Sequence, residues 1–132
     1  QDEMPFDMNA PVIEILPEDY GIWFVDAMDH PENYEGKTVK FKARVMKPRG
    51  MGSKFFVPGR TAMTCCADDT TFLGYVCKSA YAPKLTPGEW VEVTAKVGIE
   101  KRNEYQGEEG IVLDAEHVEQ CDPLEDEMVY FN

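Results

Sequence analysis

The residues of this chain best suited to chemistry lie in one short run, Arg60-Thr-Ala-Met-Thr-Cys-Cys-Ala-Asp-Asp69. It places two adjacent cysteines in a strand-like stretch and two carboxylates directly after them. Neighbouring side chains of an extended chain point to opposite faces, so residues 60–68 are expected to have one apolar and one polar face. The apolar face would hold Met63, Cys65 and Ala67. The polar face, which is the predicted binding site, would hold Arg60, Thr64, Cys66 and Asp68.

Three interpretations of the cysteine pair are open. Both thiols can be small buried hydrophobic groups, which is a common role of cysteine. Alternatively, Cys66 can be the nucleophile of a thiol-dependent enzyme, with Arg60 as the cation nearest to it in sequence. In the third interpretation the polar face binds a divalent metal.

The metal hypothesis rests on Cys66 and Asp68, because residues two apart on one face of a strand can converge on one ion. Mixed thiolate and carboxylate ligands suit zinc or a similar ion. Cys65 would point away and is not expected to be a ligand. His30 and His117 are the best third ligands by residue type, although their spacing is not that of a zinc motif.

The charges of the chain are unevenly distributed. The net charge is −12, yet residues 37–60 contain eight Lys or Arg and no carboxylate. Residues 1–36 carry ten carboxylates and residues 114–132 carry seven, and neither segment has a Lys or Arg. Acidic flanks that pair with a basic hairpin are the preferred explanation, and a basic patch for an anionic ligand is the alternative. The negative total argues against general affinity for nucleic acid.

The pattern of apolar residues predicts one helix followed by strands. A helix is expected over residues 19–29, with Asp19 as N-cap and a buried side that includes Ile22, Trp23 and Met28. Clean alternation predicts strands at 38–45 and 90–97, with further strands at 55–57, 70–78 and 110–118. Glycine-rich turns separate them, and Gly74 is expected at a bend or bulge.

These elements predict a mainly β fold, a small five-stranded OB-like Greek-key barrel with one N-terminal helix. Residues 1–18 would form an N-terminal extension, residues 19–121 the barrel, and residues 122–132 an acidic tail. The basic strand face of Lys40, Lys42 and Arg44 is where such barrels bind oligomers, so single-stranded nucleic-acid binding is an alternative function. A solvated strand face is preferred, because aromatic side chains are not interleaved with these cations.

Three segments together resemble a known family. They are Asn33-Tyr-Glu-Gly-Lys-Thr-Val39, then Pro58-Gly-Arg-Thr-Ala-Met-Thr-Cys-Cys-Ala-Asp68 with Leu73-Gly74, and Glu89-Trp-Val-Glu-Val93. The pattern is similar to the C-terminal domain of the uncharacterised YcgQ-type bacterial membrane proteins, a domain of unknown function associated with a permease. The resemblance covers about residues 20–120 and carries over Arg60, Met63, Cys65, Cys66 and Asp68. It implies an OB-like module beside a membrane permease, in an extracytoplasmic or membrane-associated parent protein.

The function expected from the sequence is therefore a non-enzymatic ligand- or partner-binding module, with metal handling as one role. No apolar run approaches the roughly 20 residues needed to cross a bilayer, and no signal segment opens the chain. The chain as given is expected to be soluble.

Overall fold

The computed structural model of the chain describes residues 3–63 and 68–131. Its helix is α1 (Tyr20–Asp29), and short 3-10 turns lie at Pro17–Asp19 (η1), Pro31–Asn33 (η2), Ala82–Lys84 (η3) and Asn103–Tyr105 (η4). The strands are β1 (Ile13–Glu14), β2 (Thr38–Met46), β3 (Phe55–Met63), β4 (Thr70–Gly74), β5 (Val76–Lys78), β6 (Trp90–Lys101), β7 (Glu109–Gln120) and β8 (Met128–Tyr130).

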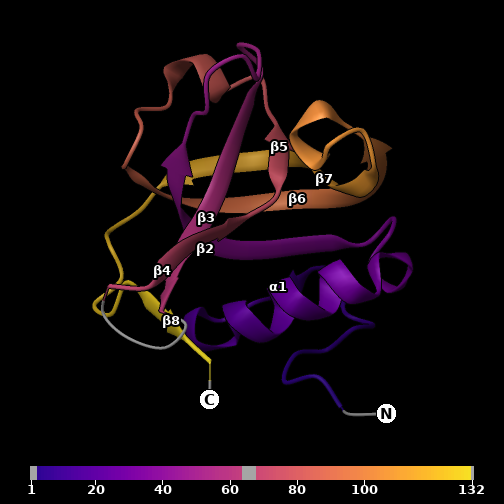
Figure 1. Ribbon diagram of the computed structural model, residues 1–132. Coiled ribbons are helices and arrows are strands. Elements are labelled where there is room, and N and C mark those ends of the chain that lie inside the picture. Colours follow the sequence, from indigo (N-terminus) through magenta and orange to yellow (C-terminus); the bar gives the residue numbers. More distant parts are fainter. Residues whose placement is uncertain (1–2, 64–67, 132) are drawn as a thin grey trace.

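Five of these strands form a closed barrel. β2 pairs with β6 and β6 with β7, both antiparallel, and β7 pairs with β5 in parallel. β5 then pairs with β3, and β3 returns to β2 through the pairs Arg44 with Gly59 and Met46 with Val57. The ring of strands and the helix confirm the predicted OB-like barrel, and Figure 1 shows α1 lying beneath it.

The alternating sequences of β2 and β6 fill the barrel as predicted. Val39, Phe41, Ala43 and Val45 are all buried, as are the residues at alternate positions 91, 93, 95 and 97 of β6. β-branched and aromatic side chains suit such a half-buried pleated surface. The expected strand 70–78 is interrupted at Tyr75, which separates β4 from β5.

Helix α1 occupies the predicted residues but turns a different side toward the barrel. Trp23 is fully buried, whereas Ile22 and Met28 are 49% and 58% exposed, so their expected burial was wrong. The helix carries two apolar stripes, and the aromatic one packs inward because large rings bury more apolar area. Asp19 stands at the N-cap position, although its side chain makes no capping hydrogen bond.

The strand β3 changes partners at two glycines. It leaves β2 at Gly59 and continues along β4, where Gly59 is opposite Gly74. A Cβ at Gly59 would lie 2.5 Å from the Leu73 carbonyl oxygen, and one at Gly74 would lie 2.8 Å from that of Pro58. Only glycine allows the two backbones to approach so closely.

Both segments that flank the barrel add strands to the sheet. Ile13 of β1 is fully buried and pairs with Val39. β8 pairs in parallel with residues 61–63 of β3, and Val129 and Phe131 lie against Gly21 of α1. Within residues 3–63 and 68–131, no helix has the length and hydropathy needed to cross a membrane.

Candidate ligand-binding groove

Arg60, the first residue of the predicted polar face, is buried and serves the fold. It is 2% exposed, and its guanidinium lies 5.6 Å above the ring of Tyr20. Nε donates to the Glu127 carbonyl at 3.3 Å, Nη1 to that of Pro17 at 3.1 Å, and Nη2 to that of Met128 at 3.4 Å. Burial lowers the pKa of Arg60 from its ordinary value, and nearby Asp126 partly offsets this effect. Arg60 therefore fastens β8 and η1 to β3.

The expected division of faces over residues 60–63 is reversed. Arg60 and Ala62 are buried, whereas Met63 is half-buried. Arg60 can be buried on this side of β3 because the carbonyls of η1, Glu127 and β8 accept hydrogen bonds from its guanidinium. Arg60 was predicted to be exposed because arginine usually lies at the surface. The carbonyl acceptors that allow its burial are too distant in sequence for a local pattern to indicate them.

Of the other predicted binding residues, only Asp68 belongs to the described part of the chain. Thr64, Cys65 and Cys66 lie outside the described residues. Asp68 is exposed and lies in a turn, and Met63 at the end of β3 pairs with Thr70 at the start of β4. The expected strand through residue 68 was therefore wrong at its end. Cys66 and Asp68 were placed on one face by the two-residue alternation of a strand, and this argument does not apply to Asp68 because it lies in a turn.

The remaining candidate groups for chemistry are separated. His30 follows α1 and lies 3.7 Å from Glu32, and His117 of β7 lies 3.2 Å from Glu119. Within the described parts of the chain, no three His, Cys, Asp or Glu side chains gather as metal ligands would. Burial raises the pKa of Cys77 well above its ordinary value and also raises that of Cys121. Neither thiol is activated for nucleophilic attack.

The basic outer face of β2 is partly neutralised. Lys40 lies 3.8 Å from Glu92 of β6, and Arg44 lies 3.7 Å from Glu127. The second contact joins the basic hairpin to the acidic C-terminal segment, as the charge distribution suggested. Both pairs are half-exposed and therefore weak.

A groove of about 490 Å³ opens beside Arg44 on the outside of the sheet. We call it the β2–β4 groove; it is lined by Arg44, Val45, Met46, Lys47, Thr61, Thr70, Thr71, Phe72, Pro87 and Gly88. Arg44 Nε is 3.5 Å from the Gly88 carbonyl. Lys47 Nζ donates to the carbonyls of Ala82 at 2.7 Å and Leu85 at 3.1 Å. The first contact holds Arg44 beside Gly88 of the groove, whereas the ammonium of Lys47 is bonded to two carbonyls that do not line it.

Sequence reasoning singled out only part of this lining. It placed Arg44 on the basic strand face and Lys47 within the basic segment 37–60, but did not single out Thr61, Thr70 or Phe72. The pairs Thr61 with Phe72 and Met63 with Thr70 place side chains of β3 and β4 on one face. The signal that could have found them was the antiparallel register of β3 and β4.

A family model, the DUF1980 C-terminal domain, matches residues 1–131. The chain belongs to this family. The comparison of this DUF1980 C-terminal domain with curated proteins gave no match.

Solved structures similar to this DUF1980 domain have low identity. A crystal structure of the mitochondrial single-stranded DNA binding protein from S. cerevisiae is 10% identical with a TM-score of 0.36, covering 65% of this chain and 95% of that one. The aspartyl tRNA synthetase from Entamoeba histolytica is 15% identical with a TM-score of 0.42, covering 74% of this chain and 19% of that one. Because these identities and TM-scores are low, the two structures do not indicate what the DUF1980 domain binds.

Proposed function

We propose that the domain is a non-enzymatic binding module of a membrane-associated assembly, and that it holds a small anionic ligand in the β2–β4 groove. The observation that carries the proposal is the chemistry of the groove lining. Its described residues include Arg44, Lys47 and three threonines, and among residues 3–63 and 68–131 no carboxylate, histidine or cysteine lines the groove. Such a lining can bind an anion, and its threonines have no histidine or carboxylate in the described lining to activate them as nucleophiles, while Lys47 Nζ is already bonded to two carbonyls.

Charge supports an anionic ligand. In a chain of net charge −12, a groove lined by Arg44 and Lys47, with no acidic residue in its described lining, is a local positive site. Arg44 binds carboxylates and phosphates through a planar set of N–H donors, and the threonine hydroxyls offer further hydrogen bonds. The contact between Arg44 and Glu127 is long and half-exposed, so an incoming anion can displace it at small cost.

Groove composition favours a small anion over an oligonucleotide. Phe72 is the one aromatic side chain in the described lining, whereas single strands bind along rows of aromatic rings. Lys40, farther along β2, is already paired with Glu92. The membrane partner is proposed from the family resemblance, in which the domain accompanies a permease.

Titration with pyrophosphate and with citrate tests the groove. At low salt we expect binding that weakens about tenfold or more in Arg44→Gln, because a hydrogen bond to a charged group is worth about 1.5–3 kcal/mol. Lys96→Gln, an exposed cation of β6 outside the groove, is the matched control and should bind like wild type. Calorimetry supplies the affinities.

Two results would overturn this assignment. One is an absence of binding by either probe at low salt, and the other is an equal loss in Lys96→Gln. A labelled oligonucleotide that binds more tightly than pyrophosphate, and loses affinity in Lys40→Gln, would favour the nucleic-acid alternative.

Thiol alkylation across pH tests the non-enzymatic character. Because their pKa values are raised, Cys77 and Cys121 hold less thiolate at every pH than a free thiol does. Cys77 should react only on unfolding, and Cys121 slowly below about pH 9. Peptide mapping after iodoacetamide treatment would identify each site. A fast reaction at Cys66 well below pH 8.5, the approximate pKa of a free thiol, would instead support the enzyme alternative.

Metal handling is the secondary role that we propose, with Cys66 and Asp68 as ligands of a divalent ion such as zinc. The support is their residue types and Asp68's exposure beside the paired ends of β3 and β4. Zinc calorimetry should show binding that disappears in Cys66→Ser and persists in Cys65→Ser, with circular dichroism as the check of folding. Equal loss in both variants would contradict this ligand set.

A further inference from the structure

Helix α1 carries an exposed apolar stripe on the side that faces away from the barrel. Its members recur every three residues and are 49%, 44% and 58% exposed. We call them the α1 stripe: Ile22, Val25 and Met28. An isolated exposed apolar residue needs no explanation, but an aligned set on one helix marks an interaction surface. The opposite side of the helix, with Trp23 and Ala27, is already fully buried against the barrel.

The α1 stripe leads into a cavity at the end of the helix. This hairpin pocket has a volume of about 350 Å³ and lies between α1 and the turn that joins β6 to β7. Its lining includes Met28, Tyr75, Tyr105, Glu108, Glu109 and Gly110. Met28 belongs to both features, so stripe and pocket form one continuous surface.

Hydrogen bonds make the pocket wall rigid. Tyr105 Oη donates to the Ile111 carbonyl at 2.6 Å and accepts from the Val76 N–H at 2.9 Å. Tyr75 Oη donates to the Phe24 carbonyl at 2.5 Å. The Tyr105 ring lies against Gly110, where a Cβ would be 2.5 Å from the ring. The pocket is thus preformed, which lowers the entropic cost of filling it.

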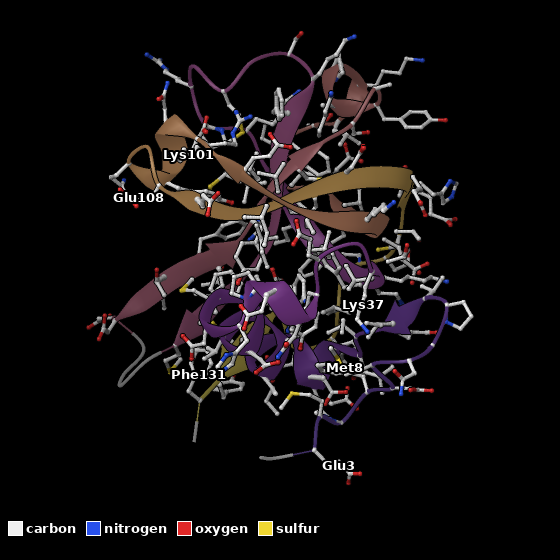
Figure 2. The ribbon with its side chains drawn as sticks, turned by 90° about the vertical axis from the view of Figure 1, so that its right-hand side faces the viewer. Glu3, Met8, Lys37, Lys101, Glu108 and Phe131 are labelled. Carbon is white, nitrogen blue, oxygen red and sulfur yellow. The ribbon has the colours of Figure 1, made fainter. Side chains whose placement is uncertain are left out.

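Carboxylates surround this surface. Asp29 ends the helix, and Glu108 and Glu109 lie on the rim of the pocket. Figure 2 shows Glu108 above the level of α1 and Phe131 below it, on the same side of the molecule. Residues 1–36 contain no Lys or Arg. On the hairpin, Arg102 is bonded to Glu104 at 2.8 Å, and Lys101 lies opposite Glu109.

We propose that the α1 stripe and the hairpin pocket bind a basic amphipathic segment of a partner protein. Apolar residues of the segment would cover Ile22, Val25 and Met28. One Lys or Arg side chain would enter the pocket, lay its stem along Met28 and meet the face of Tyr105 and the carboxylates of Glu108 and Glu109. Aromatic rings and carboxylates together favour a cation with an apolar stem.

Charge selects this partner over two others. A second copy of the chain would bring one acidic surface against another, because the same carboxylates would face each other. An anionic membrane surface would be repelled for the same reason. This inference deepens the proposed role in an assembly and rests on it, but it uses no residue of the β2–β4 groove.

The test uses a fluorescein-labelled 18-residue peptide, with leucines on one helical face and lysines on the other, and fluorescence anisotropy at 50 and 300 mM salt. We expect saturable binding at 50 mM that weakens about tenfold in the double variant Val25→Ser/Met28→Ser, and about threefold or more in Glu108→Gln/Glu109→Gln. Matched controls are Tyr81→Ser, an exposed residue just before η3 that lines neither the groove nor the hairpin pocket, and Glu116→Gln of β7, which should stay within about twofold of wild type.

Several outcomes would overturn the proposal. The first is equal peptide affinity of the wild type and the Val25→Ser/Met28→Ser variant, and the second is an equal loss of peptide affinity in the two controls. The third is self-association of the wild type, measured by sedimentation, that this double variant abolishes. The fourth is binding of the wild type to phosphatidylserine vesicles that the same variant abolishes. Pyrophosphate titration of the same variants separates the two proposals. A variant that binds pyrophosphate but has lost peptide binding supports a separate partner surface. Peptide binding by a wild type that does not bind pyrophosphate overturns only the proposal of an anion site in the β2–β4 groove.

Discussion

Replacing Arg60 with alanine is expected to lower the free energy of unfolding by about 3–5 kcal/mol, a loss typical of breaking a buried charged network. The substitution removes the donors to the carbonyls of Pro17, Glu127 and Met128 and leaves a cavity beside Tyr20. Buried carbonyls without donors are costly, and β8 would be joined to β3 by its backbone pairing alone. Urea denaturation followed by circular dichroism measures the change.

Two further variants sharpen this prediction. Arg60→Lys keeps the charge but cannot reach three separate carbonyls, so it should lose about 2 kcal/mol. Arg49→Ala, at an exposed arginine of the β2–β3 loop, should change stability by less than about 0.5 kcal/mol. If Arg60→Ala proved as stable as Arg49→Ala, the guanidinium would not be holding the fold together.

Replacing Trp23 with alanine should cost about 3–5 kcal/mol, as large-to-small substitutions of buried aromatic residues do. Trp23 is fully buried between α1 and the barrel. Its ring centroid lies 5.1 Å from that of Phe41, 5.4 Å from that of Tyr20 and 5.7 Å from that of Tyr75. The cavity would weaken the packing of the helix against Phe41 of β2 and against Tyr75, which lies between β4 and β5. Thermal unfolding would show the loss as a lower midpoint.

The matched variant Trp23→Phe separates packing from polarity. Trp23 Nε1 is buried and has no hydrogen-bond partner among the described residues. Phenylalanine removes this unsatisfied donor and part of the ring volume, so the two effects oppose each other and the net loss should be about 1 kcal/mol. A loss as large as that of Trp23→Ala would mean that the indole N–H contributes an interaction.

The sequence predicts the parts of the fold that depend on local patterns. The alternation in residues 38–45 and 90–97 identifies β2 and β6 and the side chains they bury, because a two-residue period has one solution for a half-buried strand. The inward side of α1 could not be predicted in the same way. Ile22 and Trp23 both belong to apolar stripes, and only packing against Phe41 and Tyr75 decides between them.

The surroundings of Arg60 and the lining of the β2–β4 groove depend on contacts between residues far apart in sequence, which no local sequence pattern can indicate. The acceptors of Arg60 are separated from it by 43, 67 and 68 residues. A buried arginine therefore had the same local sequence signature as an exposed one. The β2–β4 groove likewise needs the register of β3 and β4 and the turn at Pro87 and Gly88. Residue types identified its cations, but only the tertiary fold placed Thr61 and Phe72 beside them.

The hydrogen bonds between Arg60 and the carbonyls of residues 127 and 128 also suggest an order in which parts of the chain fold. During synthesis on the ribosome, Arg60 is made before either of those two acceptors. Until β8 arrives, burying the guanidinium costs more than it returns, because two of its three carbonyl partners are missing. We therefore expect this region to be hydrated in the nascent chain. Because docking of β8 closes loops of more than sixty residues, we expect it to be a late step, and destabilising β8 should mainly accelerate unfolding.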